Sequence, residues 1–309
     1  MFRFSDAHCD TISKILDENQ PLHKNNCHVD AVRLKKQNNH IQFFAAWIAP
    51  GYEPCASIIR CLEIIDKFYF EIKENGMNIV RTVRDIEKGG ALLSVEGGSA
   101  LCGRLCNVRN LYRLGVRAIT LTWNGRNELA DGVGEGEKAG GLSGFGRCVV
   151  REMNRLGMIV DVSHLSPKGF WDVSEISLAP FIASHSNAKK LCNHYRNLSD
   201  EQISDIIKKN GFIGINFCPD FLNDKKATIK DIIKHIEYIL SLGGENTVGF
   251  GADFDGVDNL PEGINGVEDM EKVFSELAKL NYPSRLINNI LYDNLHNAIK
   301  RIFESSDTL

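Results

Sequence analysis

The sequence predicts an α/β fold, a (β/α)8 barrel in which eight parallel strands are surrounded by helices, with one extra C-terminal helix. Two observations lead to this expectation. About eight short apolar runs alternate with longer patterns of helical periodicity, as a barrel of this kind requires. The chain has 309 residues, 43% of them hydrophobic, and no linker, repeat or low-complexity segment divides it. We therefore expect a single barrel domain over residues 1–309.

The first half of the chain begins with a short strand that ends in the stretch 4–10. Residues 22–37 are polar, and we expect a solvated loop and helix there. Residues 41–48 are the next strand. Residues 56–75 repeat apolar side chains at the intervals of an amphipathic helix, which Gly76 ends.

The next elements keep the same alternation. Strands are predicted over residues 91–95, 116–121, 158–162 and 181–183, and helices over residues 145–156 and 167–176, the second with Ser166 as its cap.

The last third opens with Ser199-Asp200-Glu201-Gln202, which has the pattern of a capping box and predicts a helix to residue 210. Strands follow over residues 212–217 and 247–251, and a helix over residues 229–242. Two closing helices begin near residues 267 and 283.

Composition limits the function classes. The formal net charge of -4 gives no basic surface for nucleic acid or for an anionic membrane. No apolar run is long enough to span a bilayer, and the first ten residues leave no room for a signal segment. The nine cysteines include no C-x-x-C pair, so we expect reduced thiols and a soluble cytoplasmic protein.

His8 and Asp10 are the first candidate metal ligands. Alternate side chains of a strand leave the same face, so the two would point together while Cys9 faces the other way. Neutral imidazole nitrogens and carboxylate oxygens suit zinc and neighbouring divalent metals. Taken alone, such a pair is more often an ordinary hydrogen-bonded pair than half of a metal site.

Four further metal-competent residues follow later strands. They are Glu96, His164, His185 and Asp253, and barrel enzymes build their sites at the C-terminal ends of strands. Each could be structural by itself, but six such groups at one rim indicate a metal site. They exceed what one tetrahedral ion accepts, so the simplest arrangement is two ions that share a carboxylate.

Several ordered motifs between about residues 4 and 303 resemble the membrane (renal) dipeptidase family, zinc peptidases of the amidohydrolase-like barrel superfamily. Among them are Asp6-Ala7-His8-Cys9-Asp10-Thr11, Val95-Glu96-Gly97-Gly98, Asp161-Val162-Ser163-His164, Ser184-His185-Ser186, Arg196-Asn197 and Gly251-Ala252-Asp253-Phe254-Asp255-Gly256. The resemblance implies a distorted TIM barrel with two Zn²⁺ ions. It assigns His8 and Asp10 to one ion, His164 and His185 to the other, and Glu96 to both.

The resemblance also implies a reaction, the hydrolysis of a small peptide. Arg196 would hold the substrate carboxylate, because a guanidinium offers a planar fork that matches it, although a surface ion pair is the alternative for this residue. Two zinc ions lower the pKa of a water between them to near neutral. Asp253 would take its proton and pass it to the leaving amine, so Asp253 and Glu96 are the expected catalytic residues.

Trp123 is the clear departure from the family pattern. Membrane-bound dipeptidases have a histidine after Leu-Thr at the end of strand 4, whereas this chain has Leu121-Thr122-Trp123-Asn124. In those relatives the histidine hydrogen-bonds the substrate near the scissile carbonyl. We expect Trp123 to shape an apolar pocket, while Asn124 or the metals stabilise the oxyanion. The alternative is that Trp123 turns away into the barrel wall.

Residues 130–146 hold seven glycines, but the G-x-G-x-x-G spacing is absent and Glu135 and Glu137 would repel phosphate. A loop over the site is the better interpretation. Glu128 and Asp131 lie at its start. They either cap this loop or bind the substrate amine, and the sequence does not distinguish the two roles.

Two other function classes stay open. One is a different binuclear metallohydrolase of the same superfamily that acts on lactones, amides or phosphotriesters; many of these carry a bridging carbamylated lysine, and no lysine ends a strand here. The other is a metal-dependent binding protein without turnover, which a lost ligand would mark. Dipeptides with a C-terminal D-residue are included in the expected substrates, other divalent metals could replace zinc, and a homodimer is compatible with the sequence.

Overall fold

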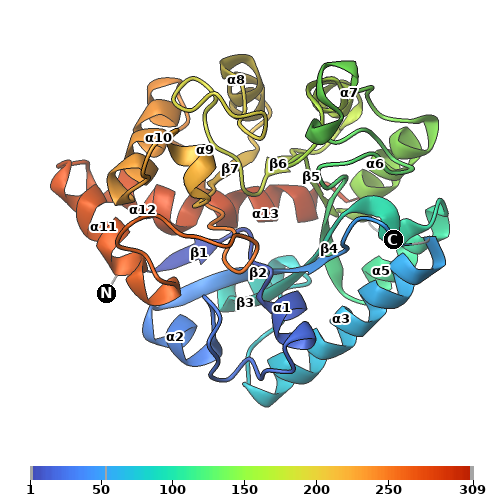
Figure 1. Ribbon diagram of the computed structural model, residues 1–309, viewed down its shortest axis with the longest axis horizontal. Helices are drawn as coiled ribbons and strands as arrows, with labels where there is room; N and C mark the ends of the chain where they lie inside the picture. The colour runs from blue at the N-terminus through green and yellow to red at the C-terminus, as the bar shows by residue number, and fades with distance from the viewer. Residues whose placement is uncertain (1–2, 53, 307–309) are drawn as a thin grey trace.

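Eight parallel strands pair in chain order and close into a barrel in the computed structural model, which describes residues 3–52 and 54–306 (Figure 1). The closure is made where β1 pairs with β8 through Asp6 and Phe250. The strands are β1 (Phe4–Asp6), β2 (Asn39–Trp47), β3 (Gly90–Glu96), β4 (Val116–Thr120), β5 (Ile159–Asp161), β6 (Ile182–Ala183), β7 (Phe212–Ile215) and β8 (Val248–Phe250).

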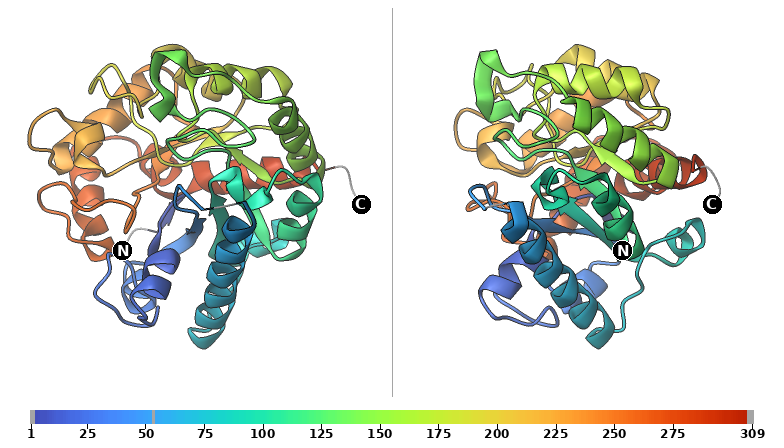
Figure 2. Two further views of the ribbon diagram at one scale, coloured as in Figure 1. Left: turned by 45° about the vertical axis from the view of Figure 1, so that its right-hand side comes forward. Right: turned by 90° about the vertical axis from the view of Figure 1, so that its right-hand side faces the viewer.

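Helices surround the barrel (Figures 1 and 2). Those in the described residues are α1 (Thr11–Asp17), α2 (Ala31–Lys36), α3 (Pro54–Glu74), α4 (Val83–Lys88), α5 (Leu105–Arg113), α6 (Gly144–Leu156), α7 (Pro167–Ile176), α8 (Asp200–Lys208), α9 (Pro219–Leu222), α10 (Ile229–Ser241), α11 (Met270–Lys279), α12 (Ser284–Asn288) and α13 (Asn294–Glu304). Shorter turns are the 3-10 segments η1 (Gly98–Leu101), η2 (Val133–Lys138) and η3 (Val267–Asp269) and the π-helical segment η4 (Asn289–Asp293).

The fold class expected from the sequence is confirmed. All eight predicted strands are present, and so are the predicted longer helices. The short helices α1, α4, α5 and α9 were not predicted. The closing helix expected from residue 283 is divided by a π-helical turn into α12, η4 and α13.

The predicted helix caps form as expected. Ser166 Oγ accepts a hydrogen bond of 3.1 Å from the Gly169 N–H at the start of α7. Ser199 Oγ accepts from the Gln202 N–H, and Gln202 Oε1 accepts from the Ser199 N–H, which completes the capping box of α8. These bonds satisfy N–H groups that have no partner inside a helix.

The inward side chains of the strands form an apolar layer at one end of the barrel and a polar layer at the other. On β3, Leu92, Ser94 and Glu96 share one face, since side chains alternate along a strand. Leu92 belongs to an apolar cluster that also contains inward residues of other strands and one face of α13. Helix α13 therefore covers one end of the barrel, on the side away from the loops that follow the strands (Figure 2). Glu96 lies toward the opposite, polar end.

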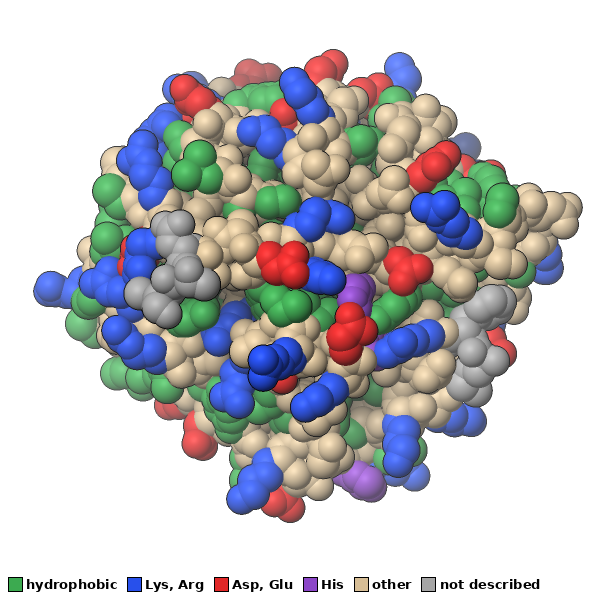
Figure 3. All heavy atoms as spheres, turned by 180° about the vertical axis from the view of Figure 1, so that it is seen from behind, with side chains coloured by type: hydrophobic (Ala, Val, Ile, Leu, Met, Phe, Trp, Pro, Cys, Tyr) green, Lys and Arg blue, Asp and Glu red, His purple; other side chains and the backbone are tan. Residues whose placement is uncertain are grey.

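The face behind the barrel carries charges of both signs. Lys and Arg side chains are spread over that face and cover more of it than the Asp and Glu side chains interspersed with them (Figure 3). In the part of the chain that the structure describes, no helix has both the length and the apolar character needed to cross a bilayer.

Candidate metal centre and substrate cleft

The six metal-competent residues expected at the strand ends lie together in the polar end of the barrel. His8 and Asp10 follow β1, Glu96 ends β3, and His164, His185 and Asp253 follow β5, β6 and β8. All six are at most 8% exposed. His164 and Asp253 have φ angles of 65° and 61°, a left-handed conformation that is uncommon outside glycine and is often found at functional sites.

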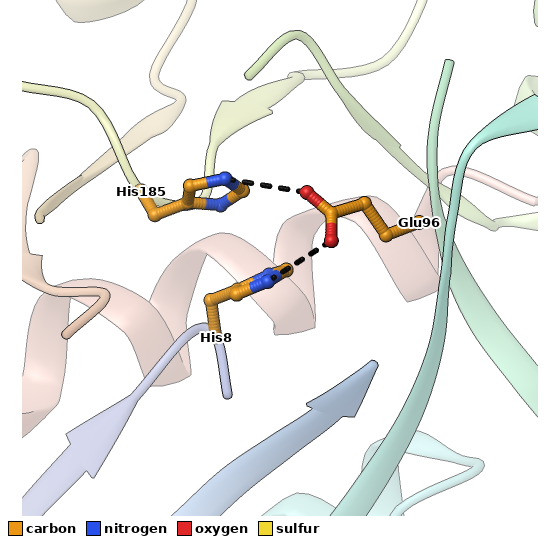
Figure 4. A group of neighbouring side chains, drawn as sticks. All are labelled: His8, Glu96 and His185. Atoms are coloured by element: carbon orange, nitrogen blue, oxygen red, sulfur yellow. Dashed lines mark ion pairs between the residues drawn. The ribbon is translucent and has the colours of Figure 1, made fainter. Parts of the chain in front are cut away.

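Glu96 lies between histidines from three strands. Its Oε2 is 3.5 Å from His8 Nε2, and its Oε1 is 3.0 Å from His164 Nε2 and 3.5 Å from His185 Nε2. Figure 4 shows the carboxylate with one oxygen toward His8 and the other toward His185. One carboxylate thus faces both halves of the site.

Hydrogen bonds fix which nitrogen of His185 carries the proton. Ser184 Oγ donates to Asp161 Oδ2 at 2.5 Å, so its single proton is already used. The 2.7 Å contact between Ser184 Oγ and His185 Nδ1 must then be a bond that Nδ1–H donates. Asp161 also accepts from Thr120 Oγ1 and from the Ser163 and Ser184 N–H groups, so its carboxylate is held rigidly.

His164 is oriented by a different partner. Its Nδ1 lies 2.8 Å from Asn124 Oδ1, and an amide oxygen can only accept, so Nδ1 is the protonated nitrogen here as well. The structure therefore places Asn124, expected to bind substrate, on the outer side of a candidate ligand. Such outer partners commonly fix the tautomer and orientation of metal-bound histidines.

With both Nδ1 atoms protonated, His164 and His185 present bare Nε2 lone pairs to each other at 2.8 Å. Burial lowers the pKa of both rings, helped by the positive charge of Arg196 at His164 and of His8 at His185. Neutral rings with facing lone pairs repel one another unless a cation lies beside them. These donors fit a divalent metal ion.

The other half of the centre gathers carboxylates around His8. His8 Nε2 is 3.3 Å from Asp10 Oδ2 and 3.8 Å from Asp253 Oδ1. Burial alone would lower the pKa of His8, but the charges of Glu96 and Asp10 outweigh it and raise that pKa well above its usual value. Burial and Glu96 raise the pKa of Asp10 to about 7. Asp10 Oδ1 is also buried without a hydrogen-bond partner. A bound metal cation would offset the negative charge of these buried carboxylates.

The chain after β8 is built for close approach to these carboxylates. A Cβ atom at Gly256 would lie 2.3 Å from both Asp10 Oδ2 and Asp253 Oδ1, so a larger residue would displace them. Asp255 accepts hydrogen bonds from Thr11 Oγ1 and the His28 N–H, which anchor this segment to α1 and its following loop. Asp255 thus has a structural role in shaping the turn.

Arg196 is 3% exposed beside the metal-competent residues. One of its terminal nitrogens donates to the His185 carbonyl at 3.2 Å, and its guanidinium carbon lies 5.4 Å from the centre of the Phe221 ring. Its Nε is buried without a hydrogen-bond partner. Buried donors are almost always satisfied, so this guanidinium has capacity left for an anionic ligand.

A cavity of about 500 Å³ opens over these groups. Trp123, Arg196, Asp253 and Trp47 are among the residues that line it. Trp123 is stacked beside His164 with ring centres 6.1 Å apart, and its edge meets Trp47 at 5.8 Å. Its ring therefore faces the cleft and not the barrel wall.

Three residues of the site were missed in the sequence. Asn216 follows β7 and donates to Asp253 Oδ2 at 2.8 Å, so its position after a strand was an available signal. Asp161 and Ser184 occur in the motifs, but only their hydrogen bonds show that they orient His185.

The sequence matches the family described as membrane dipeptidase, peptidase family M19, over residues 1–309. An uncharacterized dipeptidase of Schizosaccharomyces pombe is 38% identical over 193 residues, which are 61% of this chain and 47% of the relative. A second uncharacterized dipeptidase of that yeast is 34% identical over 277 residues, 82% of this chain and 66% of the relative. The matches thus span about half and about two thirds of these relatives.

A solved structure has the same fold. The metallo peptidase from Rhodobacter sphaeroides, liganded with a phosphinate mimic of the dipeptide L-Ala-D-Ala, superposes with a TM-score of 0.91 at 23% identity. The superposition covers 97% of this chain and 99% of that one. Together with the full-length family match, this means that the chain belongs to the membrane dipeptidase family, peptidase family M19.

Proposed function

We propose that this protein is a dipeptidase that uses two Zn²⁺ ions to hydrolyse the peptide bond of dipeptides. The observation that carries the proposal is the position of Glu96, with one carboxylate oxygen toward His8 and the other toward His164 and His185. A carboxylate between two groups of donors is suited to bridging two ions.

His8 and Asp10 would hold one ion, and His164 and His185 the other, with Glu96 shared. Imidazole nitrogens and carboxylate oxygens are the donors that zinc accepts. Two such ions supply Lewis acidity, which lowers the pKa of a water and polarises the substrate carbonyl. The outer partners Asn124 and Ser184 hold the two histidines with Nε2 unprotonated, as binding of an ion would require.

The remaining steps belong to the protein side chains. Arg196 binds the substrate carboxylate with its unused donors, which fixes the peptide by its C-terminus and favours dipeptides over internal bonds. Asp253 is held by Asn216 next to the metal-competent residues. It takes the proton of the attacking water and delivers it to the leaving amine.

The substrate range is proposed to include dipeptides with a C-terminal D-residue. The R. sphaeroides relative was solved with a mimic of L-Ala-D-Ala, which supports this range without setting the side-chain preference. A cytoplasmic location is proposed as well, because cysteines such as Cys9, Cys61 and Cys192 are free thiols, and disulfides are typical of proteins outside the cytoplasm.

The proposal is tested by incubating the purified protein with L-Ala-L-Ala, L-Ala-D-Ala and their C-terminal amides and measuring the free amino acids released. We expect hydrolysis of the dipeptides, loss of activity with a chelator and recovery with Zn²⁺. Faster hydrolysis of a lactone or phosphotriester than of every dipeptide would assign the protein to another reaction class.

A further inference from the structure

A second cavity adjoins the one over the metal-competent residues and is lined by none of them. It measures about 430 Å³. Trp123 and Pro50 line both this cavity and the cavity of about 500 Å³ over the metal-competent residues. Trp123 and Pro50 therefore lie where the two cavities adjoin. This second cavity belongs to the segments that follow β2, β3 and β4, from which Tyr52, Gly97 and Glu128 come.

The position of this cavity relates it to one end of the substrate. The strands follow one another in chain order around the barrel, so the loops after β2 and β3 lie across the barrel from those after β6 and β7. Arg196 lies in the segment between β6 and β7. A dipeptide held by its carboxylate at Arg196, with its peptide bond at Glu96, directs its N-terminal residue toward Trp123.

Arg126 and Glu128 are the charged residues among those that line the second cavity, and Asp131 lies outside it, paired with Arg126. Asp131 accepts two hydrogen bonds from Arg126 and one from the Gly140 N–H, so it holds the loop and also neutralises Arg126. Glu128 is partly buried and lines the cavity. Among residues 3–52 and 54–306, its carboxylate has neither an ion pair nor a hydrogen bond. The cavity thus combines an unneutralised carboxylate with the aromatic rings of Tyr52 and Trp123.

Carboxylates attract cations, and aromatic rings bind both the apolar stem and the charged head of a basic side chain. We propose that the second cavity binds the side chain of the substrate's N-terminal residue and prefers Lys or Arg there, with Glu128 facing the cationic group. This inference rests on the proposed dipeptidase function and adds the substrate class of its N-terminal position. It also resolves the two roles open for the acidic pair: Asp131 holds the loop and Glu128 binds a cation.

The test compares Lys-Ala with norleucyl-Ala, which has a similar apolar stem but no ammonium group. The metal-loaded protein should hydrolyse Lys-Ala with about tenfold higher kcat/KM. Glu128→Gln should bring this ratio close to one by lowering kcat/KM for Lys-Ala. Glu128→Lys should favour Glu-Ala over Lys-Ala. Glu137→Gln is the matched control, because Glu137 is exposed in η2 and outside both sets of lining residues.

A wild-type ratio near one, or a ratio that Glu128→Gln leaves unchanged, would overturn the inference while neutral dipeptides are still cleaved. If the wild-type protein hydrolyses no dipeptide at all, the proposed function itself is contradicted. Titration calorimetry with phosphinate mimics of Lys-Ala and norleucyl-Ala separates the two cases, because it requires no turnover. Equal affinity of the wild type for both mimics would also overturn the inference.

Discussion

The Nε2 atoms of His164 and His185 lie 2.8 Å apart, and each carries a lone pair in place of a proton. Asn124 and Ser184 accept the Nδ1 protons of the two rings, so neither ring can donate to the other. The bonds that make this arrangement unfavourable in an empty site also prepare it for a cation. The tautomers of the two histidines therefore depend on residues that need not touch the metal.

Replacing Ser184 by Ala should weaken metal binding about 10- to 100-fold, because His185 loses the bond that fixes its tautomer. Metal affinity measured by competition with a chromogenic chelator checks this. Thr120→Val is a suitable control, since it removes one bond to Asp161 and leaves the contact between Ser184 and His185. Unchanged affinity in Ser184→Ala would show that the hydroxyl does not orient the ligand.

Replacing Arg196 by Ala should raise KM for dipeptides by a factor equivalent to about 2 to 5 kcal/mol, because a buried charge pair with the substrate carboxylate is lost. The same change should matter little for the C-terminal amides, which lack that charge. Arg196→Lys keeps the charge and loses the planar fork, so an intermediate KM is expected. Equal losses on acids and amides would exclude Arg196 as the residue that reads the carboxylate.

Trp123 should control which substrates are accepted. Trp123→Ala removes a ring that lines both cavities and should broaden the range of dipeptides that are hydrolysed. Trp123→His introduces a ring that can donate to the developing oxyanion, a contribution of at most about 2.7 to 4 kcal/mol. Steady-state kinetics over a dipeptide panel test both variants. If neither kcat/KM nor the preference order changes, Trp123 lies outside the working site.

His235 should make the protein less stable in acid. Its Nε2 donates to the Leu222 carbonyl and its Nδ1 accepts from the Ala188 N–H, and burial lowers its pKa to about 4. Below pH 6.5 the unfolded chain binds this proton more readily than the folded one. The free energy of unfolding should fall by up to about 3 kcal/mol between pH 6.5 and 4, and level off below.

Denaturant unfolding of the wild type and of His235→Gln over this pH range isolates that contribution. The variant should be less stable at pH 7 but should lack this part of the pH dependence. His23→Gln, at an exposed position, is the control and should follow the wild type. Identical pH dependence in His235→Gln and the wild type would contradict the assignment.

The barrel and its candidate ligands could be predicted because both depend on periodic patterns. Even β6, only Ile182–Ala183, was predicted from its short apolar run. Helix α4 was missed although Thr82 and Asp85 form a capping box, because six residues are too few for a clear helical period. Asn216 was not predicted because an amide that follows a strand is not a typical metal ligand.

Other features could not be read from residue types. Ser184 orients His185 only because its own proton goes to Asp161, and this depends on distances between atoms of different strands. Likewise, Glu128 and Asp131 are equivalent as sequence letters. The bonds that Arg126 donates to Asp131 separate their roles, and these follow from how the loop folds back on itself.

Glu96 is proposed to join two metal ions in one hydrolytic centre. Zn²⁺ should be titrated into metal-free protein while metal content and hydrolysis of L-Ala-L-Ala are measured together. We expect activity to reach its maximum near two ions per chain, with the ions about 3.5 to 4 Å apart by X-ray absorption, as in other two-metal sites. Glu96→Ala should lose activity and at least one ion. Full activity with a single bound ion, or an unchanged content of two ions in Glu96→Ala, would contradict the account.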